Sequence, residues 1–232
     1  MNQLLISRNL LIASLLAAVS LAGCGQSQPA VSTGPVSTVA AGGICGEDID
    51  HSGTEFISNG NFHGGMSGWQ MVSEGPGTNL AQTQTDSSCG TALVLSRENS
   101  GNVPGLTGAE QTVSAGKAGL ASLEVQLVAI IEQQDLKSDG QLGGETPVFI
   151  TLDYTTSTGA AKSWTHGLLL AGSSINYPGR DQAIPPTYWY TYKSGNLLTM
   201  IPDLARIEKV TVGGNGDDLS SKIALVSLLG KR

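Results

Sequence analysis

The feature that most constrains the fold of this chain is a long alternation of apolar residues. Leu123, Val125, Leu127, Ala129 and Ile131 occupy every second position, and Glu or Gln separates the first three of them. A period of two places these side chains on one face of a β-strand. Residues 148–154 repeat the pattern. Both segments are therefore predicted to be strands that bury one face in a core.

Further segments combine strand-forming residues with flanking turn residues. They are Glu55–Ile57, Gly68–Val72, Ala92–Leu95, Ala109–Val113, Ser163–Leu170, Tyr188–Tyr192, Ile207–Val212 and Ile223–Leu229. A chain with about ten strands and little helix is expected to form a β-sandwich or barrel. The 31 glycines and the 13% content of charged residues suit a protein with many turns and few exposed helices.

Runs of turn residues separate the predicted strands. Thr155–Gly159 predicts the tip of a hairpin. Gly213–Gly216 is interpreted as a turn and not as a phosphate-binding loop, because no helix pattern follows it. Ser138–Gly144 and Ser173–Ile184 are predicted to be polar loops. Loops at the ends of a sandwich commonly carry binding sites.

Residues 1–23 have the organisation of a bacterial lipoprotein signal peptide. Arg8 is their only charge, and a short apolar run from Leu10 to Ala22 follows it. Leu21-Ala22-Gly23-Cys24 resembles a lipobox, which makes Cys24 the predicted site of lipidation. The alternative is an ordinary secretory signal followed by an incidental cysteine. The lipoprotein interpretation places the protein in the cell envelope, anchored to a membrane, and Gly25 in place of Asp favours the outer membrane or cell surface.

The remainder of the chain divides into a linker and one domain. Residues 24–43 comprise Cys24 and an uncharged stretch rich in Ser, Thr, Gly, Pro and Ala, which predicts a flexible linker. Residues 44–232 are long enough for one domain with a sizeable core, and no Pro/Ser-rich break divides them. The net charge of −7 argues against a nucleic-acid partner.

The two remaining cysteines form an even pair. Cys45 and Cys89 would lie in a compartment where disulfides persist, so a Cys45–Cys89 bridge is predicted. Two separate buried thiols are the alternative. The bridge would be structural in function, because the chain has no Cys-x-x-Cys redox spacing.

One motif resembles a known family. Phe56-Ile57-Ser58-Asn59-Gly60-Asn61-Phe62, followed by Gly64, Gly65, Gly68 and Trp69, is similar to the opening of carbohydrate-binding modules of the family 4, 9 and 22 type. The segments Ile207–Val212 and Ile223–Leu229 resemble the terminal hairpin-like strands of the same domains. The resemblance implies an all-β, antiparallel two-sheet jelly roll of the galactose-binding-domain-like type. It also implies sugar binding on a concave face or at the loop ends, and it does not imply catalysis.

The resemblance also implies a structural calcium ion, although this chain departs from the family pattern. His63 and the run Ser220-Ser221-Lys222 stand where family members place carboxylates, and calcium prefers oxygen ligands. The remaining candidates for oxygen ligands are Glu55, Asn61, Asp217 and Asp218. The alternative is that these acids are solvated turn residues.

An aromatic cluster supplies the candidate sugar platform. In a strand, Tyr188, Tyr190 and Tyr192 share one face, and Trp189 points to the other. If Trp189 packs in the core, the three tyrosines form an exposed ladder. Other candidate binding residues are Trp164, Tyr177, Arg180, Glu124, Gln126 and Asp153. The alternative is that the tyrosines are packed, with their hydroxyls hydrogen-bonded.

An enzymatic function is disfavoured by the motifs. The three histidines lack the spacing of a zinc site, and no nucleophile elbow is present. A pair of carboxylates can cleave glycosides, and Glu124 with Asp153 is the candidate pair in this chain. Paired acids on a sheet are, however, more often ordinary surface groups. Two functions remain: a lipid-anchored glycan-binding module, or an envelope protein that contacts protein partners through the same fold.

Overall fold

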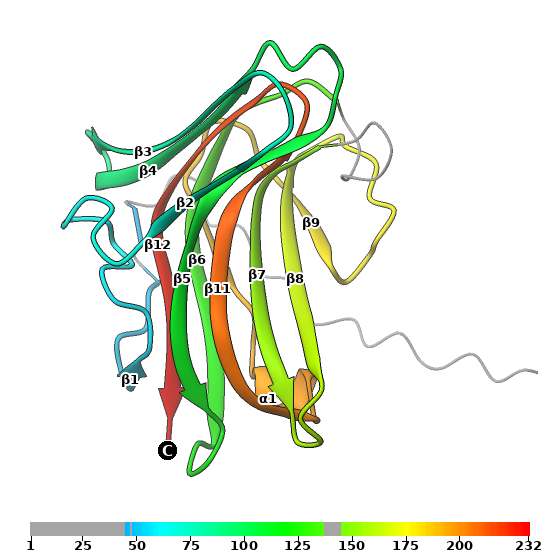
Figure 1. Cartoon of the computed structure of the whole chain (residues 1–232). Coiled ribbons are helices and arrows are strands. Elements are labelled where there is room, and N and C mark those ends of the chain that lie inside the picture. Colours follow the sequence, from blue (N-terminus) through cyan, green and yellow to red (C-terminus); the bar gives the residue numbers. More distant parts are fainter. Residues whose placement is uncertain (1–44, 47, 137–144) are drawn as a thin grey trace, which may run out of the picture. The chain divides into compact units, whose positions relative to one another are not determined.

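A computed structural model describes residues 45, 46, 48–136 and 145–232, which belong to the compact unit Ala40–Arg232. The predicted signal peptide, Cys24, the linker and the Ser138–Gly144 loop lie outside the described residues. The elements are β1 (Thr54–Glu55), β2 (Gln70–Glu74), β3 (Thr78–Asp86), β4 (Gly90–Glu98), β5 (Gly105–Gly116), β6 (Ser122–Gln134), β7 (Thr146–Thr156), β8 (Ala161–Leu170), β9 (Asp181–Ile184), β10 (Tyr190–Lys193), α1 (Leu197–Met200), β11 (Leu204–Gly216) and β12 (Leu219–Lys231) (Figure 1).

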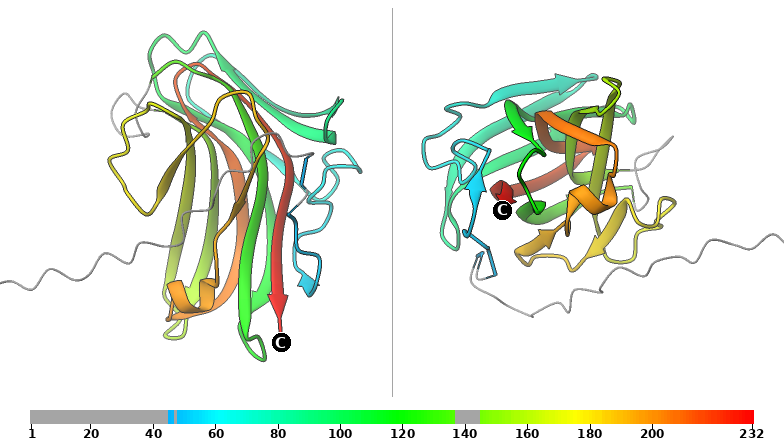
Figure 2. Two further views of the ribbon diagram at one scale, coloured as in Figure 1. Left: turned by 180° about the vertical axis from the view of Figure 1, so that it is seen from behind. Right: turned by 90° about the horizontal axis from the view of Figure 1, so that it is seen from below.

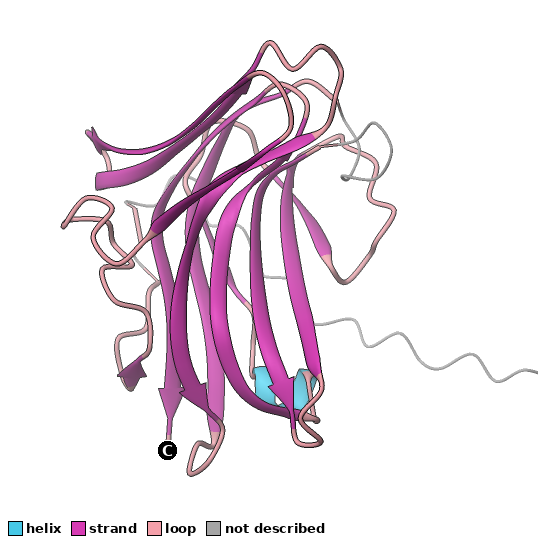
Figure 3. Cartoon of the chain, in the orientation of Figure 1, coloured by secondary structure: helices cyan, strands magenta, loops and turns pink. Residues whose placement is uncertain are grey.

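The strands form two facing sheets, and strand is the dominant structure (Figures 2 and 3). Sheet A has the order β10-β6-β12-β4-β3, and β1 pairs with β12. Sheet B has the order β2-β5-β11-β7-β8-β9. All strand pairs are antiparallel except β8 and β9, which are parallel. The predicted antiparallel two-sheet β-sandwich is therefore confirmed.

The core lies between the sheets and uses the alternations read from the sequence. Leu123, Val125, Leu127, Ala129 and Ile131 of β6 are all fully buried in it. Val148, Ile150, Leu152 and Tyr154 of β7 face them from sheet B. Phe62 and Trp69 of the opening motif pack against each other, with ring centroids 5.3 Å apart. This opening motif therefore supplies core anchors, as predicted.

The hairpin between β7 and β8 is confirmed, but the turn predicted at Gly213–Gly216 is wrong. These residues are the last four of β11, and the chain turns only at Asp217 and Asp218. β11 lies in sheet B and β12 in sheet A, so the expected terminal hairpin is a crossing between sheets. The glycines at these positions are needed for close packing and not for a turn. A Cβ atom at Gly214, for example, would lie 2.7 Å from the Leu219 side chain.

Three elements were not predicted. β3 is rich in Thr, Gln and Asn and lies at the edge of sheet A, where exposed polar residues are tolerated. β9 ends the segment Ser173–Ile184, which was predicted to be loop throughout. The single turn of α1 is capped by the Asn196 side chain, which accepts a hydrogen bond from the backbone N–H of Leu198 at 3.0 Å.

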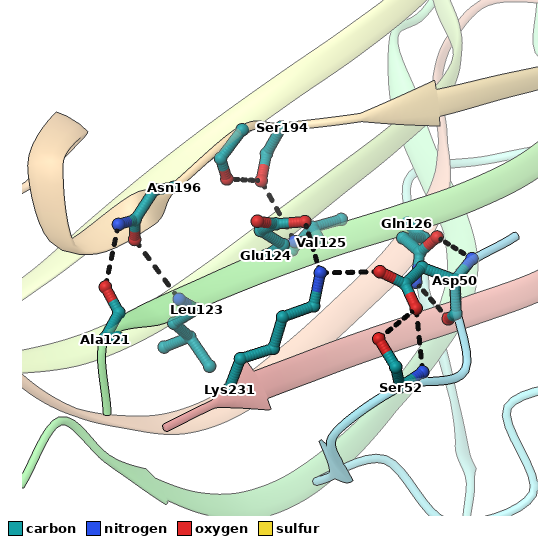
Figure 4. A network of polar contacts seen from close by, with 11 residues as sticks. Asp50, Ser52, Ala121, Leu123, Glu124, Val125, Gln126, Ser194, Asn196 and Lys231 are labelled. Atoms are coloured by element: carbon teal, nitrogen blue, oxygen red, sulfur yellow. Dashed lines mark hydrogen bonds and ion pairs between the residues drawn. The ribbon is translucent and has the colours of Figure 1, made fainter. Parts of the chain in front are cut away.

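The N-terminal strap, residues 48–55, crosses the outer face of sheet A (Figure 4). The predicted Cys45–Cys89 disulfide is confirmed, with a Cα–Cα distance of 5.2 Å. Asp50 donates its backbone N–H to Gln126 Oε1 and accepts from Gln126 Nε2 through its carbonyl, both at 2.8 Å. Lys231 Nζ lies 2.5 Å from the Asp50 carboxylate and, with Ser52, holds the pKa of that carboxyl well below its usual value. The strap thus occupies the outer face of sheet A.

Candidate functional site

The outer face of sheet B carries a line of paired positions that crosses all six strands of the sheet, and three of the six are glycines. Cross-strand partners place Val72, Gly108, Gly213, Phe149, Gly167 and Asp181 in one line from β2 to β9. Side chains of paired residues lie on the same face, and Phe149 is on the face opposite the core residues Val148 and Ile150. We call this line the transverse trough. It runs perpendicular to the strands that Figure 1 shows side by side.

The glycines of the trough are required by the backbone around them. A Cβ at Gly213 would lie 2.5 Å from the carbonyl oxygen of Thr107 and 3.1 Å from the ring of Phe149. A Cβ at Gly108 would lie 2.3 Å from the carbonyl oxygen of Val212. Close approach of β5 and β11 therefore excludes side chains here, and the consequence is a floor lined by backbone with one aromatic ring.

A hollow of about 230 Å³ opens over the part of the trough near Phe149. Its sides carry short polar groups: Thr151 and Thr165, whose hydroxyls are 2.9 Å apart, and Asn215 opposite them. Leu106 adds a second apolar surface. Hydroxyls and an amide beside apolar groups make a site that suits a polar, ring-shaped organic molecule.

A row of charged groups runs beside the trough. Lys209 on β11 contacts Glu110 on β5 at 3.1 Å and Asp153 on β7 at 3.2 Å, and Ser163 on β8 donates to Asp153 at 2.6 Å. Hydrogen bonds to Glu110 and then to Asp153 raise the pKa of Lys209. The ammonium is thereby neutralised by two carboxylates, so this border carries no excess positive charge.

Asp181, Arg180 and Tyr177 lie together at the β9 end of the trough. A Cβ at Gly167 would lie 2.6 Å from Asp181 Oδ1, so this carboxylate sits over the floor. Only 1% of the Asp181 side chain is exposed, and it accepts from Arg180 Nε at 2.9 Å and Arg180 Nη2 at 2.5 Å. The Arg180 guanidinium lies over the Tyr177 ring, 4.1 Å from its centroid.

The tyrosine ladder predicted to be exposed is not formed. Tyr190 and Tyr192 are each 7% exposed and pack in the core, because they pair with the inward-facing Ala129 and Leu127 of β6. The Tyr190 hydroxyl accepts from Gln182 at 2.6 Å, as in the alternative of packed tyrosines. Tyr188 alone is exposed, at 54%.

The expected core role of Trp189 is also wrong. Trp189 is half-buried on the outer face of sheet A, where it and Ile49 of the strap pack against the same small apolar cluster of Ala92, Val128 and Ala224. The strap therefore provides an apolar environment on the face that was predicted to be polar. Trp164 is partly buried against the main core.

The predicted polar partners lie on opposite faces of the sandwich. Glu124 and Gln126 are on the outer face of sheet A, where Gln126 is fully buried by the strap. Asp153 is on the outer face of sheet B, and Tyr177 and Arg180 contact each other near the β9 end of that sheet. The carboxylate pair Glu124 and Asp153 is thus separated by the core and cannot act on one bond.

The four candidate calcium ligands are also separated. Glu55 pairs with Leu229 near the end of β12, whereas Asp217 and Asp218 precede its start at Leu219. Ten residues of strand span about 33 Å, so these carboxylates cannot bind one ion. Glu55 instead accepts from Ile57, Leu228 and Ser227. Within the described ranges, no group of three or more His, Cys, Asp or Glu is placed to hold a metal ion.

Two buried ionisable groups belong to sheet B or adjoin it: His166 on β8, and Glu145 directly before β7. Glu145 is 0% exposed and accepts from the backbone N–H groups of Asp135 and Leu136, while its Oε1 has no hydrogen-bond partner among the described residues. Burial raises its pKa to about 7. His166 stacks on Tyr192 with centroids 3.8 Å apart, and burial, followed by the charge of Arg180, lowers its pKa to about 4.

Five residues that line the hollow were not among the predicted site residues: Phe149, Thr151, Thr165, Asn215 and Asp181. One signal was present: Gly167 lies inside the predicted strand Ser163–Leu170, and a glycine inside a strand can mark a close approach of backbone or ligand. The threonines alternate with core residues and carried no other distinguishing pattern. In the part of the chain that the structure describes, no helix is long and apolar enough to cross a membrane.

Comparisons with known proteins find likenesses of fold. No family model and no curated protein matches the chain. Tailspike protein 4 of bacteriophage CBA120, in its enzymatically active domain, is 15% identical over 76% of this chain, with a TM-score of 0.47. This chain spans only 21% of that tailspike chain.

Two carbohydrate-binding modules are also similar in structure. The family 11 module of Clostridium thermocellum, in complex with a β-1,3-1,4-mixed-linked tetrasaccharide, is 10% identical over 76% of this chain and 95% of its own, with a TM-score of 0.44. The CBM22-1 xylan-binding domain of Paenibacillus barcinonensis Xyn10C is 7% identical over 79% of this chain and 99% of its own, with a TM-score of 0.43.

Proposed function

We propose that this protein is a non-catalytic glycan-binding module, held at the cell envelope by a lipid on Cys24, and that the transverse trough on sheet B is its binding site. The observation that carries the proposal is the line of paired positions across six strands, in which three of the six residues are glycine and Phe149 supplies an aromatic surface. A linear molecule can lie in this line against backbone and Phe149.

The chemistry of the trough supports a glycan. Thr151, Thr165 and Asn215 offer hydroxyl and amide groups that can exchange hydrogen bonds with sugar hydroxyls. Phe149 and Leu106 offer apolar surface for the C–H face of a sugar ring. The cations Lys209 and Arg180 are each paired with carboxylates, which favours an uncharged ligand over a polyanion.

Filling the hollow is expected to abolish glycan binding. Thr151→Trp places a large side chain in it, and affinity for glycans selected on an array with residues 44–232 should fall at least about tenfold, which corresponds to about 1.4 kcal/mol. Thr191→Trp is the matched control, since Thr191 is also a half-buried strand threonine but lies on sheet A. Equal affinity of both variants and wild type would exclude the trough.

A glycan array without any bound glycan would favour the alternative function, a cell-envelope protein that contacts protein partners through the same fold. The array therefore decides between the two classes of ligand before any variant is made.

The lipid anchor has a direct test. Cys24→Ser removes the thiol that would be acylated, so the protein is expected to move from the membrane fraction to the soluble fraction. The measurement is fractionation after a high-salt wash, which removes proteins held only by charge. A Cys24→Ser variant that stays with the membranes would contradict the proposed anchor.

A further inference from the structure

Arg97 is a charged residue of sheet A that lies fully inside the protein. It belongs to β4, and only 1% of it is exposed. A guanidinium keeps its charge in a folded protein, so a buried one needs acceptors for its N–H groups. The acceptors are Asn79 Oδ1 and the backbone carbonyl oxygens of Glu74, Pro76, Val103 and Asp217. Most of the contacts of this side chain therefore go to the main chain.

Three of these carbonyl groups lie at the ends of neighbouring strands of sheet B. Glu74 is the last residue of β2, Val103 precedes the start of β5 at Gly105, and Asp217 directly follows β11. The donor–acceptor distances to Arg97 are 2.8, 3.3 and 3.2 Å, in that order. β2, β5 and β11 are adjacent in the sheet. Arg97 thus joins three adjacent strand ends of sheet B.

The same strand ends carry one side of the hollow in the trough. Leu106 and Asn215 line the hollow and are cross-strand partners, and Glu74 is the partner of Leu106 on β2. Gly105 alternates with Leu106 and so belongs to the inner face of the sheet. A Cβ at Gly105 would clash with Arg97 Nη1. The guanidinium therefore lies directly against the inner side of the backbone that bears Leu106.

We propose that Arg97 is a positioning residue for glycan binding, which fixes from sheet A the backbone that carries Leu106 and Asn215. This inference rests on the proposed function. The planar guanidinium holds its acceptors in one fixed arrangement. A site whose geometry is set in advance binds more tightly, because the ligand does not have to order the strand ends. Lysine would keep the charge, but its ammonium has three donors on a flexible stem and cannot reproduce the same set of contacts.

The test measures the affinity of the full-length protein and of its Arg97→Lys variant for a polysaccharide that the wild type binds, with xylan, mixed-linkage β-glucan and β-1,4-galactan as probes. Arg97→Lys is expected to lower this affinity by about fivefold to tenfold. The matched control is Gln126→Met, which removes the hydrogen bonds of another fully buried polar side chain of sheet A, on the strap side. The control should lose stability in a thermal melt and keep its affinity.

A double-mutant cycle separates positioning from a general effect on the fold. If Arg97 acts through the Leu106 and Asn215 side of the hollow, the effect of Arg97→Lys on affinity should shrink when Asn215→Ala is already present. The same substitution should keep its full effect beside Thr165→Ala, which changes the hollow on β8. An equal effect of Arg97→Lys in both backgrounds would contradict the inference.

A milder variant covers the case in which Arg97→Lys does not fold. Asn79→Ala removes one acceptor of the guanidinium on β3 of sheet A and should lower the affinity by a smaller factor. Wild-type affinity in a folded Arg97→Lys variant, or in Asn79→Ala where the lysine variant is unfolded, would overturn the role of Arg97 and leave the proposed function intact. Absence of binding by the wild type to every probe and to the array would overturn both.

Discussion

Replacing Cys45 and Cys89 with Ala is expected to lower the free energy of unfolding by about 4 kcal/mol, because the bridge closes a loop with a sequence separation of 44. The reason is that the bridged chain has fewer unfolded conformations. Chemical denaturation of the oxidised wild type and of the double variant measures the difference. Glycan affinity should not change, because the bridge and the strap lie on sheet A and the trough on sheet B.

The reduced wild-type protein is the control for this experiment. Its stability should equal that of the double variant, since both lack the same covalent constraint. A loss below about 1 kcal/mol in the variant would contradict the assignment of this stability to the restricted unfolded chain.

Glu145→Gln is expected to stabilise the protein at pH 8 and not at pH 4. The pKa of Glu145 is raised to about 7 by burial, so the stability that its protonated form contributes is complete below the usual carboxyl pKa and is lost as the pH rises through 7. The stability difference between variant and wild type should therefore grow by about 3 kcal/mol between pH 4.5 and pH 7.

His166→Phe is the converse variant and keeps an aromatic ring between Trp164 and Tyr192. The pKa of His166 is lowered to about 4, so its contribution is present above the usual histidine pKa and is lost as the pH falls through 4. The variant should gain about 3 kcal/mol relative to wild type between pH 6.5 and pH 4. Difference curves that are flat for either variant would contradict the assigned burial effect.

The two groups also oppose each other in the wild-type protein. Between about pH 4.5 and 6.5, Glu145 lowers stability as the pH rises while His166 raises it by a similar amount. The wild-type curve should therefore be flatter in this range than the curve of either variant. Denaturation series at intervals of half a pH unit would reveal the two slopes separately.

Much of the fold could be predicted from the sequence because buried strands leave a period of two. The β6 and β7 alternations identified the core face correctly, since each is long and several of the residues between the apolar ones are charged or polar, such as Glu124, Gln126, Thr151 and Asp153. β3 could not be found in this way, because an edge strand with polar residues on both faces has no apolar period.

The site was harder to predict than the fold. Alternation of apolar and polar residues separates the two faces of a strand, but it does not show which face the rest of the protein covers. Tyr190 and Trp189 were assigned to the wrong faces, since the strap makes the outer face of sheet A apolar and no local pattern announces it. Similarly, Gly213 was read as a turn because its role depends on Thr107 and Phe149, which are distant in sequence. The neighbours of a residue such as Gly213 are determined by the register between paired strands, which the local sequence does not specify.

The bridge between Cys45 and Cys89 also determines how the domain would bear mechanical load. Tension on the chain ahead of Cys45 passes through a covalent link into the turn between β3 and β4, so the strap and β1 are not peeled away first. If a ligand bound in the trough anchors sheet B, the tension that enters sheet A at Cys89 must be transmitted to sheet B through the packed core. The weakest element in this path is then the apolar contact between the two sheets, which must separate over a broad area at once.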